Sequence, residues 1–261
     1  MSHFKQSFCI PCFWQGQEET DLRKVLEAAK RIGYPAFEFW FRDNAPFDLL
    51  VKLSGEYGLV ISTICGHKSL KDGLNKKENH ARIRAELSES IEVAKRHGIR
   101  NLICFSGNRE GKDDEDCLDV VAEGIKQSAG EAEAANVMLV IELLNSKVDH
   151  PDYQCDHAAW GVEVCKRVGS PNVKLLYDIY HMQIMEGDLI RTITENIEHI
   201  GHFHTAGNPG RNDPDETQEI YYPAVMRAIE ETGYDGYVAH EFRAKDAPLA
   251  ALEAAYKTCD V

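Results

Sequence analysis

Two segments of the chain, VKLLYDIYH at residues 173–181 and IGHFHTAGNPGR at residues 200–211, indicate how it folds. Each begins with a short apolar run that is typical of a buried strand. Each run then ends on a side chain that can bind a metal ion, Asp178 in the first and His204 in the second. The stretch between them is long enough for a helix, so the two strands are expected to lie parallel in one sheet.

The same pattern occurs once on either side of these segments. VMLVIELLN at residues 137–145 supplies Glu142, and DGYVAHEF at residues 235–242 supplies Glu241. Successive ligand-type side chains are 36, 26 and 37 residues apart, about one strand–helix unit each. Because the C-terminal ends of strands converge on one face of a parallel barrel, we expect a single site there. Its four members are Glu142, Asp178, His204 and Glu241.

Strand-like and helix-like patterns alternate along the whole chain. The expected strands cover residues 4–10, 36–39, 59–65, 101–105, 137–143, 173–177, 200–204 and 237–241. The expected helices cover residues 18–32, 46–57, 77–97, 114–135, 158–168, 189–196, 223–232 and 248–257. Eight strand–helix units in 261 residues predict an α/β fold, a (β/α)8 TIM barrel that forms one domain over residues 1–261. No Gly-x-Gly-x-x-Gly motif follows the first strand, which removes the dinucleotide-binding interpretation.

The composition restricts the classes of partner. The formal net charge of -14 argues against nucleic acid, because phosphate binding needs clustered Lys and Arg. We expect no membrane partner, since the chain lacks a continuous apolar run of about 18 residues. Without a secretion signal, the eight cysteines are expected to be reduced thiols of a cytoplasmic protein.

Two of the cysteines, Cys9 and Cys12, form a lone Cys-Ile-Pro-Cys motif. Such a motif can be a redox pair or half of a zinc site. The sequence shows neither a second pair of ligands nor the context of a thioredoxin fold. It therefore favours neither role.

Two Glu, one Asp and one His make a ligand set dominated by hard oxygen atoms. Such a set suits Mg²⁺ or Mn²⁺, with Co²⁺ or Zn²⁺ as alternatives, whereas a structural Zn²⁺ site would more often contain Cys. We therefore predict a divalent metal ion as the cofactor.

Other polar side chains are expected on the same face of the barrel. His181 follows Asp178 by three residues, and Arg211 follows a turn, so that both could bond to substrate oxygens. His202 is expected to have a structural or supporting role beside His204. The candidate substrate-binding residues are His181, Arg211, Asn145, His67, Glu38 and Trp40.

The block from residue 200 to residue 242 resembles the C-terminal block of the hydroxypyruvate isomerase family. That family belongs to the xylose-isomerase-like TIM barrels, together with the ketose 3-epimerases and endonuclease IV. The similarity extends through VIELLN and LLYDIYHMQ and covers roughly residues 137–242. Residues 1–110 resemble the family in layout only, through GYPAFEFWF and the helix at residues 77–97.

The resemblance implies that Glu142, Asp178, His204 and Glu241 bind one divalent metal ion. It also implies that Glu142 and Glu241 are an acid/base pair and that His181 and Arg211 contact substrate. Removal of a proton next to a carbonyl builds charge on oxygen, which a divalent ion would stabilise. One carboxylate would take the proton, and the other would return it. We therefore expect an isomerase that acts on a small sugar or 2-oxo acid; a homo-oligomer is compatible with the sequence.

Two departures from the family pattern leave the substrate open. Hydroxypyruvate isomerases tend to carry Gln where this chain has His204, whereas ketose epimerases carry His. Residues 218–222 read QEIYY, where the family usually reads GEINY. The alternatives are a ketose 3-epimerase, a lyase or dehydratase on the same barrel, and a sugar-binding barrel without catalysis. Endonuclease IV is disfavoured by the acidic charge and by too few His ligands for a three-metal cluster.

Overall fold

A parallel sheet forms the centre of the protein. The computed structural model describes residues 3–14, 16, 18–44 and 46–261. Seven strands pair in the order β1-β9-β8-β7-β6-β5-β4, and β2 pairs with β3. The strands are β1 (Lys5–Phe8), β2 (Ala36–Phe37), β3 (Val60–Ile61), β4 (Thr63–Cys65), β5 (Asn101–Cys104), β6 (Met138–Glu142), β7 (Val173–Asp178), β8 (Ile200–Thr205) and β9 (Tyr237–His240).

Backbone hydrogen bonds link the two groups of strands. An isolated parallel bridge joins Cys9 to Glu38, and the Glu38 amide donates to the Phe8 carbonyl at 2.8 Å. On the other side, Ser62 separates β3 from β4, and its amide donates to the Phe37 carbonyl at 2.8 Å. The segment predicted as one strand at residues 59–65 is therefore one interrupted strand. The ring of strands closes, which confirms the predicted TIM barrel.

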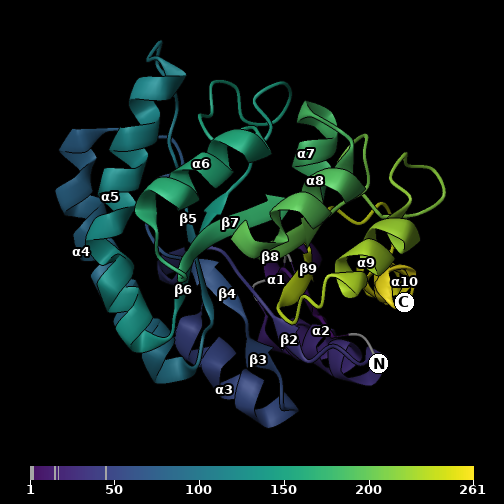
Figure 1. Ribbon diagram of the computed structural model, residues 1–261. Helices are drawn as coiled ribbons and strands as arrows, with labels where there is room; N and C mark the ends of the chain where they lie inside the picture. The colour runs from purple at the N-terminus through teal and green to yellow at the C-terminus, as the bar shows by residue number, and fades with distance from the viewer. Residues whose placement is uncertain (1–2, 15, 17, 45) are drawn as a thin grey trace.

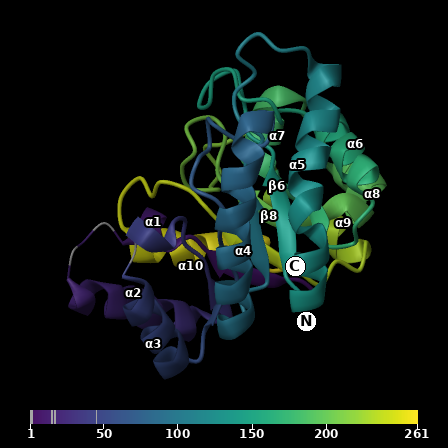
Figure 2. The ribbon, with the colours of Figure 1, turned by 90° about the vertical axis from the view of Figure 1, so that its left-hand side faces the viewer.

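Helices surround the strands, as Figures 1 and 2 show, with α4 and α5 on one side of the barrel and α9 and α10 on another. The α-helices are α1 (Ile10–Phe13), α2 (Glu19–Ile32), α3 (Phe47–Tyr57), α4 (His80–His97), α5 (Asp114–Ala135), α6 (Ala158–Val168), α7 (Ile179–Met185), α8 (Leu189–Asn196), α9 (Tyr222–Glu231) and α10 (Pro248–Cys259). Short 3₁₀ helices are η1 (Arg42–Asn44), η2 (Lys77–Asn79) and η3 (Ile197–His199). Gly33 and Gly98 end α2 and α4 with positive φ angles of 118° and 69°, a conformation that glycine adopts without steric cost.

The strands are buried because helices cover the outer side of the barrel and other strands lie across its inner side. Several strands carry apolar runs, although polar side chains such as Thr63, Asn101 and His202 are also buried within the barrel. Leu139, Val140 and Ile141 of β6 have no exposed surface, and the same is true of Leu175 and Leu176 of β7. Such continuous apolar runs are expected in parallel sheets that are buried on both faces. Among the described residues, no helix combines the length and the apolar character needed to cross a bilayer.

Candidate active site at the C-terminal ends of the strands

The four predicted ligand-type side chains lie together at one end of the barrel. Glu142 ends β6, Asp178 ends β7, His204 lies near the end of β8, and Glu241 follows β9 directly. Asp178 and His204 are register partners in neighbouring strands. All four residues are buried, with 1–6% of their surface exposed. The fold therefore concentrates three carboxylates and one imidazole at the position where barrel enzymes carry catalytic groups.

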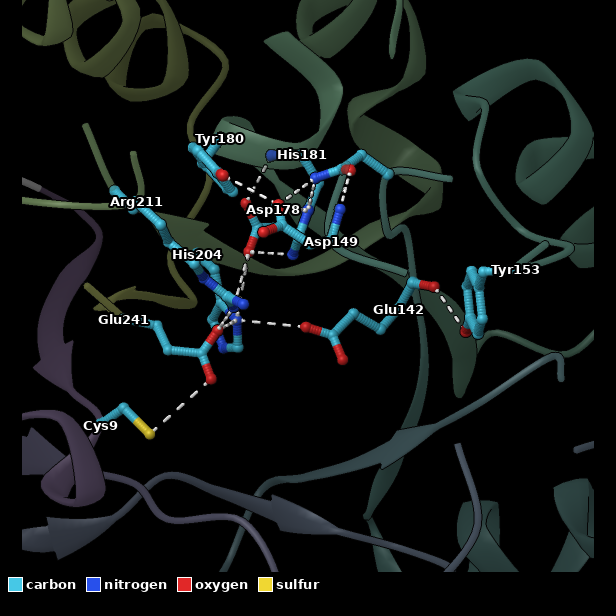
Figure 3. A network of polar contacts seen from close by, with 12 residues as sticks. Cys9, Glu142, Asp149, Tyr153, Asp178, Tyr180, His181, His204, Arg211 and Glu241 are labelled. Carbon is cyan, nitrogen blue, oxygen red and sulfur yellow. Dashed lines mark hydrogen bonds and ion pairs between the residues drawn. The ribbon is translucent and has the colours of Figure 1, made fainter. Parts of the chain in front are cut away.

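The Nδ1 atom of His204 is the centre of this cluster (Figure 3). It lies 3.4 Å from Glu142 Oε1 and 3.3 Å from Glu241 Oε2. Asp178 Oδ2 lies at 3.8 Å. One ligand atom from each of the four residues falls within 4.8 Å of the others, a spacing that one metal ion can span.

The other ring nitrogen of His204, Nε2, lies beside the carboxylate of Glu38. Glu38 Oε1 lies 2.8 Å from His204 Nε2, and Glu38 Oε2 lies 2.8 Å from His202 Nε2. Burial alone would raise the pKa of Glu38, but the charges of His204 and His202 lower it to about 2. An ionised Glu38 therefore lies beside Nε2 of His204, while Nδ1 faces the three carboxylates. Burial would lower the pKa of His204, but the charges of Glu38 and Glu241 raise it well above its usual value.

The cluster fits a divalent cation. Both ring nitrogens of His204 are buried and have no hydrogen-bond partner among the described residues, and Nδ1, which faces the carboxylates, would bind a metal ion on loss of its proton. Three carboxylates and one imidazole nitrogen match the ligand preferences of Mn²⁺ and Mg²⁺ and admit Co²⁺ or Zn²⁺. The residues that would hold the ion are Glu142, Asp178, His204 and Glu241.

Burial and charge act differently on the three carboxylates. Burial raises the pKa of Glu142, and it raises the pKa of Asp178 to about 7. Burial would also raise the pKa of Glu241, but the positive charge of Arg211 holds it well below its usual range. A cation bound among these groups would favour the ionised form of each of them.

Glu241 has the most hydrogen-bond donors of the cluster. The indole Nε1 of Trp40 donates to its Oε1 at 2.6 Å, and the Cys9 thiol lies 3.9 Å from the same oxygen. Nη2 of Arg211 donates to Oε2 and lies 3.9 Å from Asp178 Oδ2. The Arg211 guanidinium also lies over the ring of Tyr180, 5.7 Å from its centroid. These contacts fix both the orientation of Glu241 and the position of Arg211.

Asn145 and His181 form a second polar group beside the cluster. The Asn145 amide donates to His181 Nδ1 and to Asp149 Oδ2, each at 2.6 Å. Because an amide N–H donates to Nδ1, the His181 proton lies on Nε2. Nε2 is buried, lies 3.7 Å from Asp178 Oδ2 and has no hydrogen-bond partner within the described part of the chain. His181 is thus arranged as a neutral donor next to the cluster.

Asp178 links the cluster around His204 to the pair formed by Asn145 and His181. Its Oδ1 accepts a hydrogen bond from the His181 backbone N–H at 2.9 Å and so caps α7, while Oδ2 faces His204. The helix α7 was not predicted, because its sequence is buried and lacks an amphipathic stripe. The sequence signal for it is the N-cap residue Asp178 itself.

A cavity of about 270 Å³ opens beside the cluster. Glu142, Glu241, Arg211 and Trp40 line it together with apolar side chains such as Phe105. A polar end and an apolar wall suit a small organic substrate. A larger groove of about 710 Å³ lies between residues 213–223 and α10, and none of the four clustered side chains lines it.

Of the six substrate-binding candidates, Trp40 and Arg211 line the cavity of about 270 Å³. Glu38, Asn145 and His181 contact the cluster without lining the cavity, and His67 lies apart from both. Its Nε2 accepts a hydrogen bond from the Phe105 backbone at 2.8 Å, and burial lowers its pKa to about 4. His67 does not line the cavity beside Glu142. It lies instead in a smaller recess with Arg42 and Glu86.

The sequence did not indicate two residues of this region, His150 and Asp149. His150 lines the cavity, and its ring centroid lies 5.3 Å from that of His181. The carboxylate of Asp149 accepts a hydrogen bond from the Tyr180 hydroxyl at 2.8 Å. Asp149 and His150 lie in a long irregular segment between β6 and α6, where no periodicity indicates the direction of a side chain.

Comparisons with known proteins agree with this architecture. A family model described as xylose isomerase-like TIM barrel matches residues 26–258, and the chain belongs to that family. A putative hydroxypyruvate isomerase of Danio rerio is 27% identical over 256 residues, covering 94% of this chain and 93% of that protein. The hydroxypyruvate isomerase of Escherichia coli K12 is 31% identical over 167 residues, 64% of each protein.

A solved structure shows the same fold over nearly the whole chain. The crystal structure of an AP endonuclease, family 2, from Brucella melitensis has a TM-score of 0.84 and 25% sequence identity, and the match covers 97% of both chains. The resemblance stated from the sequence is thus confirmed. Together the relatives support an isomerase enzyme.

Proposed function

We propose that this protein is a divalent-metal-dependent isomerase of a small hydroxy-carbonyl compound, such as hydroxypyruvate. The observation that carries the proposal is the convergence of Glu142, Asp178, His204 and Glu241 beside a cavity of suitable size. The names of the relatives support the same reaction class. A divalent cation held by the four side chains would stabilise the negative charge that develops on a substrate oxygen.

In the proposed reaction, Glu142 and Glu241 exchange protons with the substrate. They are carried by β6 and β9, and β7 and β8 lie between these strands, so the two carboxylates reach the cavity from different sides. One carboxylate would remove the proton from the carbon beside the carbonyl, and the other would deliver a proton to the neighbouring carbon. Arg211 and the Nε2 proton of His181 would hold substrate oxygens in place.

The proposal is tested by following hydrogen exchange with nuclear magnetic resonance in deuterated water. The protein would be incubated with Mn²⁺ and with a panel of 2-oxo acids and ketoses. An isomeric product that carries solvent deuterium would support the proposal. Loss of a water molecule from the substrate would indicate a lyase instead, and no exchange with any member of the panel would count against catalysis of this type.

A ketose 3-epimerase is the second candidate, and His204 is the residue that favours it. The epimerases resemble this chain in carrying His at this position. The two reactions use the same proton acceptors and differ in the carbon that receives the proton. Product analysis in the exchange experiment separates them, because an epimer keeps its carbonyl position.

Arg211→Lys should raise the KM for the true substrate by about 10-fold or more, the effect of losing one charge-assisted hydrogen bond. Lysine keeps the charge but loses the planar fork of donors and the contact with the Tyr180 ring. Steady-state kinetics and a Mn²⁺ titration would be measured together, with Arg243→Lys at the exposed neighbouring arginine as the control. An unchanged KM would remove Arg211 from the substrate site.

Glu38→Gln should weaken Mn²⁺ binding by ~10–100-fold, the usual effect of losing the partner that orients a metal-binding histidine. A glutamine has one acceptor oxygen and no charge, so it cannot pair with both His202 and His204. Calorimetric titration measures the affinity, and ¹⁵N chemical shifts of His204 report which nitrogen carries the proton. Glu86→Gln makes the same chemical change outside the cluster. Wild-type affinity in Glu38→Gln would contradict the orienting role.

Two further features remain part of the proposal. Residues 1–261 are proposed to form one domain, since the ring of strands uses segments from β1 to β9. The cytoplasm is the proposed location, because all eight cysteines are free thiols, as is usual in reducing compartments.

A further inference from the structure

The cysteines of the Cys-Ile-Pro-Cys motif lie side by side at the edge of the candidate active site. Cys9 follows β1, and Cys12 lies one turn later in α1, with its backbone N–H donating to the Cys9 carbonyl at 3.0 Å. Cys9 is buried and Cys12 is half-buried. Residues three apart on a helical turn have Cβ atoms about 5–6 Å apart. A disulfide needs roughly 4 Å, so a small local adjustment would join the two sulfur atoms.

Access to the eight cysteines is unequal. All of them lie in the described part of the chain, and Cys12 is the one that is not buried. Cys12 lines a second cavity of about 250 Å³, together with Trp40, Arg211 and Glu241. A small oxidant that enters this cavity would meet Cys12 first and would find Cys9 directly behind it. Exposure therefore favours oxidation at Cys12 over the seven buried cysteines.

Cys9 in turn contacts Glu241, the side chain that we propose both binds the metal ion and transfers a proton. Its thiol points at Oε1 of Glu241 over 3.9 Å, as Figure 3 shows, and Trp40 donates to the same oxygen. A disulfide has no S–H group and must draw the Cys9 sulfur toward Cys12. Bond formation would remove one of the donors that orient Glu241.

We propose that Cys9 and Cys12 are a reversible oxidation site, and that their disulfide weakens the Glu241 site. With hydrogen peroxide as the oxidant, the Cys12 sulfur attacks one peroxide oxygen and becomes a sulfenic acid, and one water molecule is released. The Cys9 sulfur then attacks the Cys12 sulfur and displaces the hydroxyl group as a second water molecule. The two thiols are oxidised and peroxide is reduced to water, which balances both steps.

The test combines peptide mass spectrometry with metal binding. Trypsin cuts after Lys5 and after Arg23, so one peptide contains both cysteines and no other. After treatment with hydrogen peroxide, its mass should fall by that of two hydrogen atoms. Mn²⁺ affinity should fall about 10-fold, as expected when a partner of a metal ligand is lost, and dithiothreitol should restore both.

Two variants make the result specific. Cys12→Ser should bind Mn²⁺ like the reduced wild type and should be insensitive to peroxide. Cys117→Ser, at a buried position on α5, should keep the full peroxide response. Oxidation of Cys12 to a sulfinic acid without a disulfide, or a disulfide that leaves Mn²⁺ affinity unchanged, would overturn the proposal.

The effect on Glu241 rests on the proposed metal site, and the experiment distinguishes the two. A reduced protein that binds no Mn²⁺ would contradict the proposed function. The peptide mass would then still decide whether the two cysteines form the disulfide.

Discussion

Glu142→Gln and Glu241→Gln should each lower turnover by at least ~10²-fold, the usual contribution of a positioned acid or base. Glutamine has almost the size of glutamate but cannot take up or release the proton. Both carboxylates lie within 3.4 Å of His204 Nδ1, and both line the cavity. An amide oxygen can still approach a cation, so we expect metal to be largely retained.

The two variants need not behave alike, and their difference is informative. If each carboxylate serves one proton step, one variant can still exchange substrate hydrogen with solvent while it forms no product. Deuterium incorporation and product formation would be measured for each, with metal content determined on the same samples. Glu163→Gln, on the outer helix α6, makes the same change away from the site. Normal turnover of both variants with metal bound would show that the two-carboxylate mechanism is wrong.

Removal of divalent metal should abolish activity, and Mn²⁺ or Mg²⁺ should restore it. His204→Ala and Asp178→Asn should each weaken metal binding by at least ~10-fold, since each changes a proposed ligand. Asparagine at residue 178 is a sharp test because it also caps helices well. The hydrogen bond to the His181 backbone is therefore kept, while one charge is lost.

The readouts for this test are calorimetric titration, elemental analysis and thermal unfolding. Asp188→Asn, just before α8, is the matched change at an exposed position. Wild-type unfolding of Asp178→Asn together with weak metal binding would assign the effect to the ligand. Full activity in excess chelator, with no metal found by elemental analysis, would contradict the metal site.

The sequence predicts the barrel well because each strand is a local signal. An apolar run followed by a polar residue sets both the strand and the end at which it carries chemistry, as for Asp178 and His204. The helices predicted at residues 114–135, 158–168 and 189–196 agree with α5, α6 and α8. Glycines that end helices are likewise signals of the local sequence. These features depend on neighbours along the chain and not on the closed ring.

Other features depend on contacts that only the closed ring creates. The sequence groups Glu38 with the substrate-binding candidates, but both of its oxygens lie 2.8 Å from buried imidazoles. Residues 36–39 and 200–204 are far apart in the sequence, so no local pattern could pair them. His150 lies in an irregular loop, and its approach to His181 follows from tertiary packing. The interruption of a strand at Ser62 likewise depends on tertiary contacts.

The burial of the acidic cluster also bears on the stability of the fold. Charged groups that are almost wholly withdrawn from water reduce folding stability, and apolar side chains of similar size in their place are often neutral or stabilising. Glu142, Asp178, His204 and Glu241 are all present, each no more than 6% exposed. Apolar side chains of similar volume in their place are therefore expected to raise the free energy of unfolding, at the loss of the proposed site.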